Sequence, residues 1–309
     1  MAAASQTLSV ERGGRRRLRL PRSVTVAKYA MVMPALSLFL VFYVTPVIAG
    51  VVISLFRWNG LESPSYIGLG NYERLFEDPV FVDNVRVTLV VVGVSLAVIL
   101  PLALLLAVCL SGKGRLLPLF RWILFVPVVM PLAAVALLWS EIFNPLNGLA
   151  NELLGHLGIA PVAWLGDPST AIWALILVSI WGFVGLHIVI QLSALSAIPT
   201  ELKEAARLET PSTMKVFRHV VLPLLRGSLT VSAVLTITGT FVYFTSLSFV
   251  MTKGGPVHAT EVLGLRAYLE GFAALDFGLA SAITTVTMLI TITLVGGALL
   301  IGARTRVEY

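Results

Sequence analysis

Residues 87–112 read VTLVVVGVSLAVILPLALLLAVCLSG and carry no charged side chain over 26 positions. An α-helix rises about 1.5 Å per residue, so this run can cross the roughly 30 Å of hydrocarbon in a bilayer. An uncharged apolar stretch of this length is typical of a membrane span rather than of a helix in a soluble core. The run therefore predicts a transmembrane helix, with lipid as the solvent around it.

Five further uncharged runs of comparable length follow the same pattern, at 29–56, 122–140, 168–200, 227–252 and 277–303. We therefore predict an all-α membrane protein with six transmembrane helices. Their expected positions are about 29–56, 87–110, 119–142, 170–195, 223–250 and 279–303. The uncharged stretch 153–166 is too short for a seventh span and contains Gly155, Gly158 and Pro161, so we expect a turn at the membrane interface.

The composition supports a membrane protein. Charged residues make up 12% of the chain, against roughly 25% in a soluble domain. Hydrophobic residues reach 57% and the mean hydropathy is +0.93. One compact core could not hide this much apolar material, which excludes an ordinary cytosolic enzyme.

The reactive residue types show no pattern typical of a cofactor site. Cys109 is the single cysteine, which excludes a disulfide framework or a site built from several cysteines. The four histidines lack metal-ligand spacing, and no GxxxxGK[ST] phosphate loop is present. We expect this chain to bind no cofactor and no metal, so that any ATP would be bound by another subunit.

The distribution of basic residues predicts the orientation. Cytoplasmic segments collect Lys and Arg during insertion. With the N-terminus inside, 17 of the 22 basic residues fall in inner segments, while 11 of the 16 acids fall outside. We therefore predict an N-in, C-in domain over 29–303, with a basic cytoplasmic segment at 1–28 and a cytoplasmic tail at 304–309. The N-terminal arginines suit anionic lipid beside an uncleaved first span better than nucleic acid.

One inner loop, 196–222, mixes small residues with charges of both signs and is predicted to be helical. Thr200 is the expected N-cap, with Glu201 and Glu204 in the first turn where the helix dipole favours anions. Ala205 and Ala206 leave little side-chain bulk, so a partner surface could approach closely. A short amphipathic helix resting on the membrane is the other interpretation of this composition.

The spacing in this loop resembles the EAA loop of importer-type ABC transporter permeases, EAA-x3-G-x9-I-x-LP. The matching residues are Glu204, Ala205, Ala206, Thr210, Val220, Leu222 and Pro223, and Glu209 stands at the position before the family glycine. Thr210 replaces that glycine. Because a left-handed conformation would strain a β-branched residue, we expect the backbone here to differ from members with glycine.

The resemblance covers nearly the whole chain and is strongest to the carbohydrate-uptake group of these permeases. The segments that carry it outside the EAA loop are Gly68–Tyr72, Asp78–Phe81 with Thr88–Leu89, Trp139, Gly148 with Asn151, Trp164–Leu165 and Thr252–Pro256.

This resemblance implies a type I ABC importer permease fold in the plasma membrane of a bacterium or archaeon. It further implies a transporter subunit and not an enzyme, with half of the pathway for a sugar or oligosaccharide. The implied partners are a second homologous permease, an ATPase dimer that binds ATP and Mg, and an extracytoplasmic substrate-binding protein. The EAA loop would form a coupling helix in a cleft of the ATPase, with Glu204 contacting a basic residue there.

Two predicted helices supply polar and aromatic side chains that could contact a sugar. Sugars need hydrogen-bonding groups and flat apolar surfaces, which in lipid should point into the bundle. The candidates are Trp181, Phe183 and His187 in the fourth span and Thr240, Phe241, Phe244, Ser246 and Ser248 in the fifth. The other interpretation is that the hydroxyls bond their own helix and the rings pack against neighbours.

Three alternative functions follow from the same chain. A permease for glycerol phosphate or a glycerophosphodiester is one, but the six uncharged runs by definition offer no Arg or Lys to bind phosphate. An ATP-independent secondary carrier would favour carboxylates within the membrane, and none occurs in the six uncharged runs. A membrane enzyme would need clustered catalytic residues at one bilayer face, and the sequence offers no such cluster.

Overall fold

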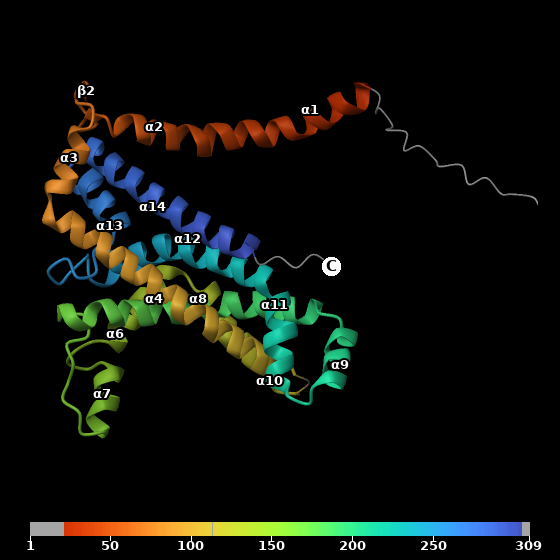
Figure 1. Cartoon of the computed structure of the whole chain (residues 1–309). Coiled ribbons are helices and arrows are strands. Elements are labelled where there is room, and N and C mark those ends of the chain that lie inside the picture. Colours follow the sequence, from red (N-terminus) through yellow and green to blue (C-terminus); the bar gives the residue numbers. More distant parts are fainter. Residues whose placement is uncertain (1–21, 113, 305–309) are drawn as a thin grey trace, which may run out of the picture. The chain divides into compact units, whose positions relative to one another are not determined.

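The computed structural model describes residues 22–112 and 114–304, which form helices joined by short loops (Figure 1). The chain divides into two compact units, one ending at Ala49 and the other beginning at Gly50. Within the predicted terminal segments, residues 1–21 and 305–309 lie outside the described residues. Helix α1 begins at Arg22, inside the segment predicted to precede the first span.

The elements follow in chain order, where η marks a π-helical turn. They are α1 (Arg22–Phe39), η1 (Leu40–Val44), α2 (Thr45–Ile53), β1 (Phe56–Arg57), β2 (Ser65–Tyr66), α3 (Gly70–Glu77), α4 (Pro79–Leu110), α5 (Leu117–Val129), α6 (Leu132–Ile142), α7 (Leu149–His156), α8 (Pro168–Ala197), α9 (Thr200–Glu209), α10 (Thr213–Val216), η2 (Phe217–Val221), α11 (Leu222–Leu224), α12 (Arg226–Met251), α13 (Leu263–Tyr268), η3 (Leu269–Ala273) and α14 (Phe277–Arg304). The two strands pair antiparallel, with Phe56 opposite Tyr66.

Five helical segments of the described chain are long and apolar enough to cross a membrane. They are Tyr29–Ile53, Pro79–Leu110, Pro168–Ala197, Arg226–Met251 and Phe277–Ala303. A sixth crossing exists only if α5 and α6 together count as one span. The all-α, multi-span class is thus confirmed, while the number of six and the orientation stay predictions.

The third predicted span is not a continuous helix. Helices α5 and α6 meet at an angle of 102°, so the prediction of one helix over 119–142 is wrong. A proline disfavours helical backbone in the residue before it, and Met130 before Pro131 is extended at φ −73° and ψ 139°. Pro131 itself has ψ 132°, so two successive residues leave the helical region and the chain turns sharply.

Helices α4 and α8 both begin with an acidic cap followed by proline. The Asp78 carboxylate accepts a hydrogen bond from the Val80 amide, and Asp167 accepts one from the Ser169 amide. The Ser169 hydroxyl and amide hold the pKa of Asp167 below its usual value. Because of the first cap, α4 starts eight residues before the predicted position 87 and carries Asp83 and Arg86 in its first two turns.

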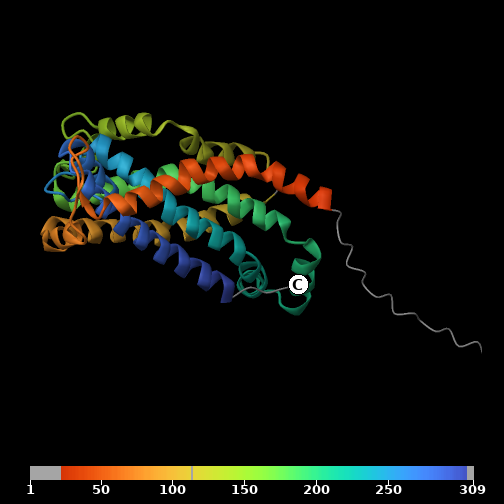
Figure 2. The same ribbon diagram turned by 90° about the horizontal axis from the view of Figure 1, so that it is seen from above.

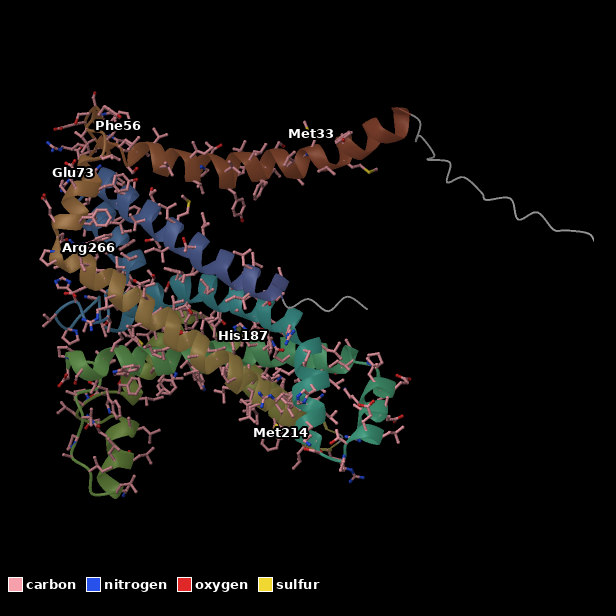
Figure 3. The ribbon with its side chains drawn as sticks, in the orientation of Figure 1. Met33, Phe56, Glu73, His187, Met214 and Arg266 are labelled. Carbon is pink, nitrogen blue, oxygen red and sulfur yellow. The ribbon has the colours of Figure 1, made fainter. Side chains whose placement is uncertain are left out.

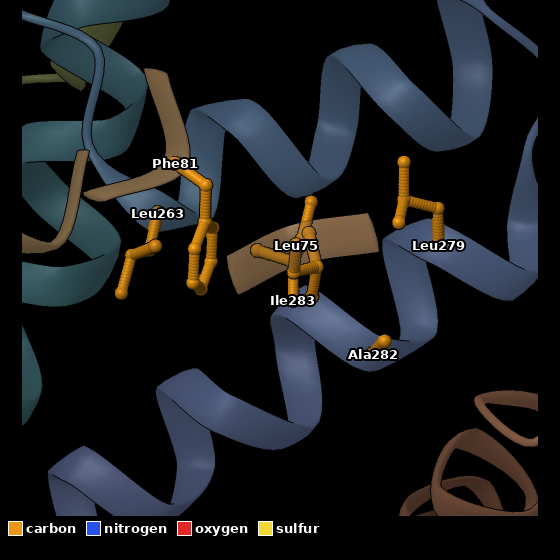
Figure 4. Packing of buried hydrophobic residues seen from close by; sticks show 6 residues of the cluster. All are labelled: Leu75, Phe81, Leu263, Leu279, Ala282 and Ile283. Atoms are coloured by element: carbon orange, nitrogen blue, oxygen red, sulfur yellow. The ribbon is translucent and has the colours of Figure 1, made fainter. Parts of the chain in front are cut away.

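Helix α8 lies at the centre of the unit that begins at Gly50, packed against α4, α5 and α12. Figures 1 and 2 show α4, α8 and α12 side by side, with α9 and α10 at one end of the bundle and α3 and α13 at the other. At this second end a buried apolar cluster joins α3, α4, α13 and α14 (Figure 4). Its members are Leu75, Phe81, Leu263, Leu279, Ala282 and Ile283.

Gly185 sets the distance between α5 and α8. A Cβ at this position would clash with the carbonyl oxygen of Leu124 on α5 and lie 3.0 Å from a Val128 methyl group. Helices in lipid associate by close packing rather than by exclusion of water, so small residues at the contact allow the backbones to approach.

We expect Gly185→Ala to destabilise the folded protein by about 1–3 kcal/mol, because the added methyl group has no space without moving α5. The measurement is the thermal unfolding midpoint of the detergent-purified protein. Gly93→Ala on α4 is the matched control, since a Cβ there meets no atom within 4 Å. Equal midpoints for both variants and the parent would contradict this account of the α5–α8 contact.

Candidate functional site

Helix α9 contains Glu204, Ala205 and Ala206, the first part of the motif that resembles the EAA coupling loop. The helix begins at Thr200, directly after Pro199, which is extended at ψ 137°. The N-cap residue is Pro199 and no side chain caps the helix, so the prediction of Thr200 as N-cap is wrong. Proline fixes the turn by its own backbone preference, and the helix starts one residue earlier than a threonine cap would allow.

The motif residues of α9 are largely open to solvent. Glu204, Ala205 and Glu209 are exposed, and Ala206 is half-buried. Leu208 is 91% exposed and lies four residues after Glu204, on the same helix face. Sequence reasoning passed over Leu208, although a large apolar residue one helical turn after the glutamate was the available signal. The exposed face of α9 therefore combines a carboxylate, a small residue and a large apolar side chain.

Thr210 ends α9 in an extended conformation, with φ −149° and ψ 130°. Its amide donates to the Ala206 carbonyl at 3.2 Å, and its hydroxyl accepts from the Ser212 amide at 3.4 Å. The backbone here avoids the left-handed region, which a β-branched residue occupies only with strain. Leu222 and Pro223, the end of the motif, lie half-buried in α11.

Two basic side chains satisfy carbonyl groups at the ends of transmembrane helices. The Lys203 ammonium of α9 donates to the Leu195 carbonyl of α8 at 3.2 Å. Arg121 of α5 donates through Nε to the Leu110 carbonyl at the end of α4, also at 3.2 Å. The last four carbonyls of a helix have no partner within it, and the helix dipole favours a cation there. Lys203 therefore ties α9 to α8; linear spacing had singled out neither basic residue.

An apolar cluster joins the segment that follows α9 to the same end of α8. Leu195 and Ile198 at the end of α8 pack with Val221 and Leu225, and Ala107 of α4 completes the buried set. The segment from η2 to α11 is thus packed against two transmembrane helices. Because α9 contacts η2, a displacement of α9 would reach α8 directly through Lys203 and indirectly through η2 and this cluster.

The contact between α8 and α12 contains a row of polar pairs. Gln191 donates to the Ser232 hydroxyl at 2.9 Å and accepts from the Ser228 hydroxyl at 2.8 Å. One turn closer to the start of α8, His187 Nε2 lies 3.3 Å from the Thr236 hydroxyl oxygen. Gln191 and His187 are fully buried, where no water can bond them, so the hydroxyl groups of α12 supply their hydrogen bonds.

Beyond His187, two aromatic rings pack onto glycines of the opposite helix. Phe183 of α8 covers Gly239 of α12, where a Cβ would lie 2.5 Å from the ring. Tyr243 of α12 in turn places its hydroxyl over Gly182 of α8. The Phe183 and Tyr243 rings meet edge to face, with centroids 5.1 Å apart. The glycines allow two large rings to lie between closely spaced backbones.

Three buried polar atoms around these rings have no hydrogen-bond partner within the described part of the chain. They are His187 Nδ1, the Tyr243 hydroxyl and Trp139 Nε1. Trp139 packs edge to face on Trp181 with centroids 5.5 Å apart, and Phe183 lies 6.1 Å from the His187 ring. Figure 3 shows His187 inside the bundle, between its two ends. Buried polar groups are normally bonded, so this aromatic patch offers unused groups to a polar ligand.

The predicted substrate residues fall into two groups. Trp181, Phe183 and His187 belong to the aromatic patch together with Tyr243 and Trp139, which sequence reasoning had not assigned to it. The periodicity of α12 could have indicated Tyr243, but the unused hydroxyl is visible only in three dimensions.

The other five candidates serve packing or local hydrogen bonds in this structure. Phe244 is buried in a core with Val91 and Leu175, and Ser248 donates to the Thr260 carbonyl at 2.6 Å. Ser246 donates to the Val242 carbonyl of its own helix. Thr240 and Phe241 border a small cavity against α4.

Metal-ligating side chains do not gather anywhere in the described ranges 22–112 and 114–304: no group of three His, Cys, Asp or Glu could hold an ion there.

Comparison with known proteins gives one family. Residues 99–307 match the family described as binding-protein-dependent transport system inner membrane component. A probable ABC transporter permease protein of Bacillus subtilis, YurN, is 37% identical over 87% of this chain and 93% of its own length. The trehalose/maltose transport system permease MalF of Thermococcus litoralis is 34% identical over 85% of this chain and 89% of its own.

Two further similarities extend the comparison. The diacetylchitobiose uptake system permease NgcF of Streptomyces coelicolor is 31% identical, covering 91% of this chain and 84% of its own. Among solved structures, a bacterial alginate ABC transporter in complex with its alginate-bound periplasmic protein matches with a TM-score of 0.80 at 21% identity. That match covers 93% of this chain and 98% of the other, and it shows a shared fold.

We expect Gln191→Leu to lower the stability of the α8–α12 contact by about 1 kcal/mol, since two interhelical hydrogen bonds are lost within the bundle. Thermal unfolding of the detergent-purified protein measures this. Ser193→Ala is the control, because the Ser193 hydroxyl is exposed and bonds only the Val189 carbonyl of its own helix. A Gln191→Leu protein as stable as the control would show that the polar row contributes nothing to packing.

Proposed function

This chain belongs to the family of binding-protein-dependent transport system inner membrane components, and from that premise we propose that it conducts a sugar or oligosaccharide as one half of an ABC importer. It is a transporter subunit rather than an enzyme, and a multi-pass protein of the plasma membrane. Its own contribution would be a pathway through the helix bundle, with energy supplied from outside the chain. Membership of this family also removes the secondary-carrier and membrane-enzyme alternatives.

Coupling to the ATPase is the first part of the proposal. Glu204, Ala205 and Leu208 form an exposed face on α9, and Glu204 makes no ion pair within the described part of the chain. A carboxylate on a short helix is suited to a charge-assisted contact with a basic residue on a motor subunit. That subunit would bind ATP and Mg, because this sequence contains no phosphate loop.

The link from α9 to the substrate patch runs along one helix. Lys203 bonds α9 to the end of α8, and η2, which contacts α9, packs at the same place through the apolar cluster around Ile198. About four turns back along α8 lie Trp181 and Phe183 of the aromatic patch. Movement of α9 on closure of the ATPase dimer would therefore shift α8 against α12 and change the packing of the patch. This is the physical basis for alternating access in the proposal.

The aromatic patch supports a neutral sugar as substrate. Rings of Trp181, Phe183 and Tyr243 offer flat apolar faces for sugar C–H groups, and the unused polar atoms offer hydrogen bonds. The patch contains no Lys or Arg, which disfavours the glycerol phosphate alternative. Similar permeases are named for trehalose and maltose, for diacetylchitobiose and for lactose.

The remaining partners follow from the same proposal. A second, homologous permease would close the pathway from the other side, and two ATPase subunits would lie below the pair. An extracytoplasmic binding protein would deliver the sugar, in keeping with the family's description as binding-protein-dependent. Lipid surrounds the apolar outer faces, and no nucleic acid takes part.

The experiment that tests this function is ATP-driven uptake of labelled trehalose, lactose and glycerol phosphate into proteoliposomes. They would contain the tagged chain with the permease and ATPase that co-purify with it, and the binding protein would be added outside. ATP-dependent uptake of a sugar supports the proposal. Uptake of glycerol phosphate alone would replace the substrate class, and uptake by this chain alone without ATP would overturn the proposal.

We expect Glu204→Lys to lower sugar uptake at least about tenfold, because reversing one charge of an interface pair costs several kcal/mol. The ATPase recovered with the tagged chain should fall in parallel, while the amount of inserted chain stays unchanged. Glu201→Lys is the control: it makes the same charge change at an exposed residue of α9 outside the motif. Normal uptake by the Glu204 variant would remove α9 from the coupling step.

Tyr243→Phe should reduce the maximal rate of sugar uptake, at saturating loaded binding protein, by about two- to tenfold. The variant keeps the ring but loses one hydrogen bond to substrate, worth about 0.5–1.5 kcal/mol. Tyr268→Phe on α13 is the control, since that ring lies outside the patch and is exposed. If both variants transport at the parent rate, the Tyr243 hydroxyl does not contact the sugar.

A further inference from the structure

A groove of about 610 Å³ opens between the starts of α4 and α8 and the loop that joins α12 to α13. Its polar side chains are Asp83, Arg86 and His258, and its floor and walls are mostly aliphatic. Helix α8 extends about 45 Å from this groove to the residues before α9, so the groove and α9 lie at opposite membrane faces. In the proposed orientation the groove faces the extracytoplasmic side.

Asp83 and Arg86 present two unpaired charges to this groove. They lie three positions apart on α4 and both are exposed, yet neither forms an ion pair or a side-chain hydrogen bond with any residue of the described ranges. Nearby, by contrast, Arg266 forms ion pairs with Asp78 at 3.0 Å and with Glu270 at 2.9 Å. The groove thus offers one acid and one base to an outside partner, next to a cluster of internal ion pairs.

The lip of the groove, residues 257–259 of the loop between α12 and α13, has a strained backbone that hydrogen bonds hold in place. Val257 and His258 have φ angles of 48° and 60°, a region that β-branched residues occupy only when their surroundings force them. Three bonds fix the loop from both sides. Asn84 donates to the Glu261 carbonyl at 2.8 Å, Ser248 donates to the Thr260 carbonyl at 2.6 Å, and the Leu263 amide donates to the Thr88 hydroxyl at 3.0 Å.

This rigid lip exposes an apolar side chain. Val257 is 84% exposed although its backbone is fixed, and His258 beside it contacts Glu261, which also pairs with Arg266 (Figure 3 labels Arg266 at this end of the bundle). A preformed shape lowers the ordering cost of binding, so a fixed exposed valine is suited to a protein contact. The lining of the groove includes no Phe, Tyr or Trp, which makes a sugar a poorer fit to this surface.

We propose that this groove docks the extracytoplasmic binding protein, receiving a surface segment that presents an aliphatic side chain to Val257 and an acid and a base to Arg86 and Asp83. The inference rests on the proposed function and adds the surface through which the binding protein engages this subunit. Opposite charges on the two partners would set the register of docking and speed the encounter.

The test uses the complete transporter in lipid nanodiscs and the binding protein that stimulates ATP hydrolysis by the wild-type complex. The apparent docking affinity is read from the binding-protein concentration that gives half-maximal stimulation. Arg86→Glu and Asp83→Lys should each weaken docking at least about tenfold and should leave the stimulated rate at saturation unchanged. Arg57→Glu, an equal charge change at an exposed residue outside the groove, should dock normally.

A second readout detects the contact itself. Cys109 is the only cysteine, so Cys109→Ser followed by Val257→Cys gives a single thiol on the lip. A thiol-tethered photo-crosslinker at 257 should capture the binding protein, and the same probe at position 57 should not. Because this variant retains Asp83 and Arg86, it tests the contact even if the charge variants fail to fold.

The outcomes separate the two levels of the proposal. Unchanged docking by both charge variants, with no cross-link from position 257, overturns the groove as a docking surface while leaving the importer function intact. Unchanged docking with reduced uptake of one sugar would overturn it in favour of a sugar contact. A wild-type complex whose ATP hydrolysis responds to no binding protein would overturn the proposed function itself.

Discussion

A polar group buried in hydrocarbon has no water to bond, so it must find its partner within the protein. Helix α8 shows how this requirement organises the fold. Gln191 and His187 bond hydroxyl groups of α12, and the glycines of both helices let Phe183 and Tyr243 pack between closely spaced backbones. Where the row of bonds stops, three buried polar atoms are left without partners in the described chain, beside aromatic rings. The same requirement that fixes the helices therefore marks the place where a substrate could supply the missing bonds.

The ends of the helices meet the same requirement with charged side chains. At one end, Lys203 and Arg121 satisfy terminal carbonyls of α8 and α4, and the first of these bonds joins α9 to the bundle. At the other end, Asn84 and Thr88 of α4 hold the loop before α13, while Arg266 gathers three carboxylates. Both ends are thus cross-linked by hydrogen bonds or ion pairs, and α4 and α8 connect them. Such an arrangement can pass a displacement from one membrane face to the other.

The amino-acid sequence predicted the features that depend on composition and on linear spacing. Long uncharged runs predicted the apolar helices, and the spacing from Glu204 to Pro223 alone was enough to indicate the family. The ends and breaks of the helices were not predicted, because uncharged runs alone set the expected spans. Pro131 bends the third apolar run because it acts on Met130, and Asp78 starts α4 two turns early. Tyr243, Leu208 and Lys203 were missed because their significance lies in an unused hydroxyl, an exposed face and a bond to another helix.

The proposed coupling requires that α9 and α8 move as one body, which a distance measurement in the assembled transporter can check. Spin labels would replace Glu201 on α9, outside the face assigned to the ATPase, and Trp173 near the start of α8. Both positions are exposed, and the single cysteine of the chain would first be removed. Electron paramagnetic resonance would compare the nucleotide-free complex with the complex trapped with ATP. We expect one narrow Glu201–Trp173 distance distribution that stays the same in both states, while the distance from Glu201 to the exposed Leu289 on α14 changes. A Glu201–Trp173 distance that shifts with ATP would mean that α9 moves independently of α8 and that the proposed coupling is wrong.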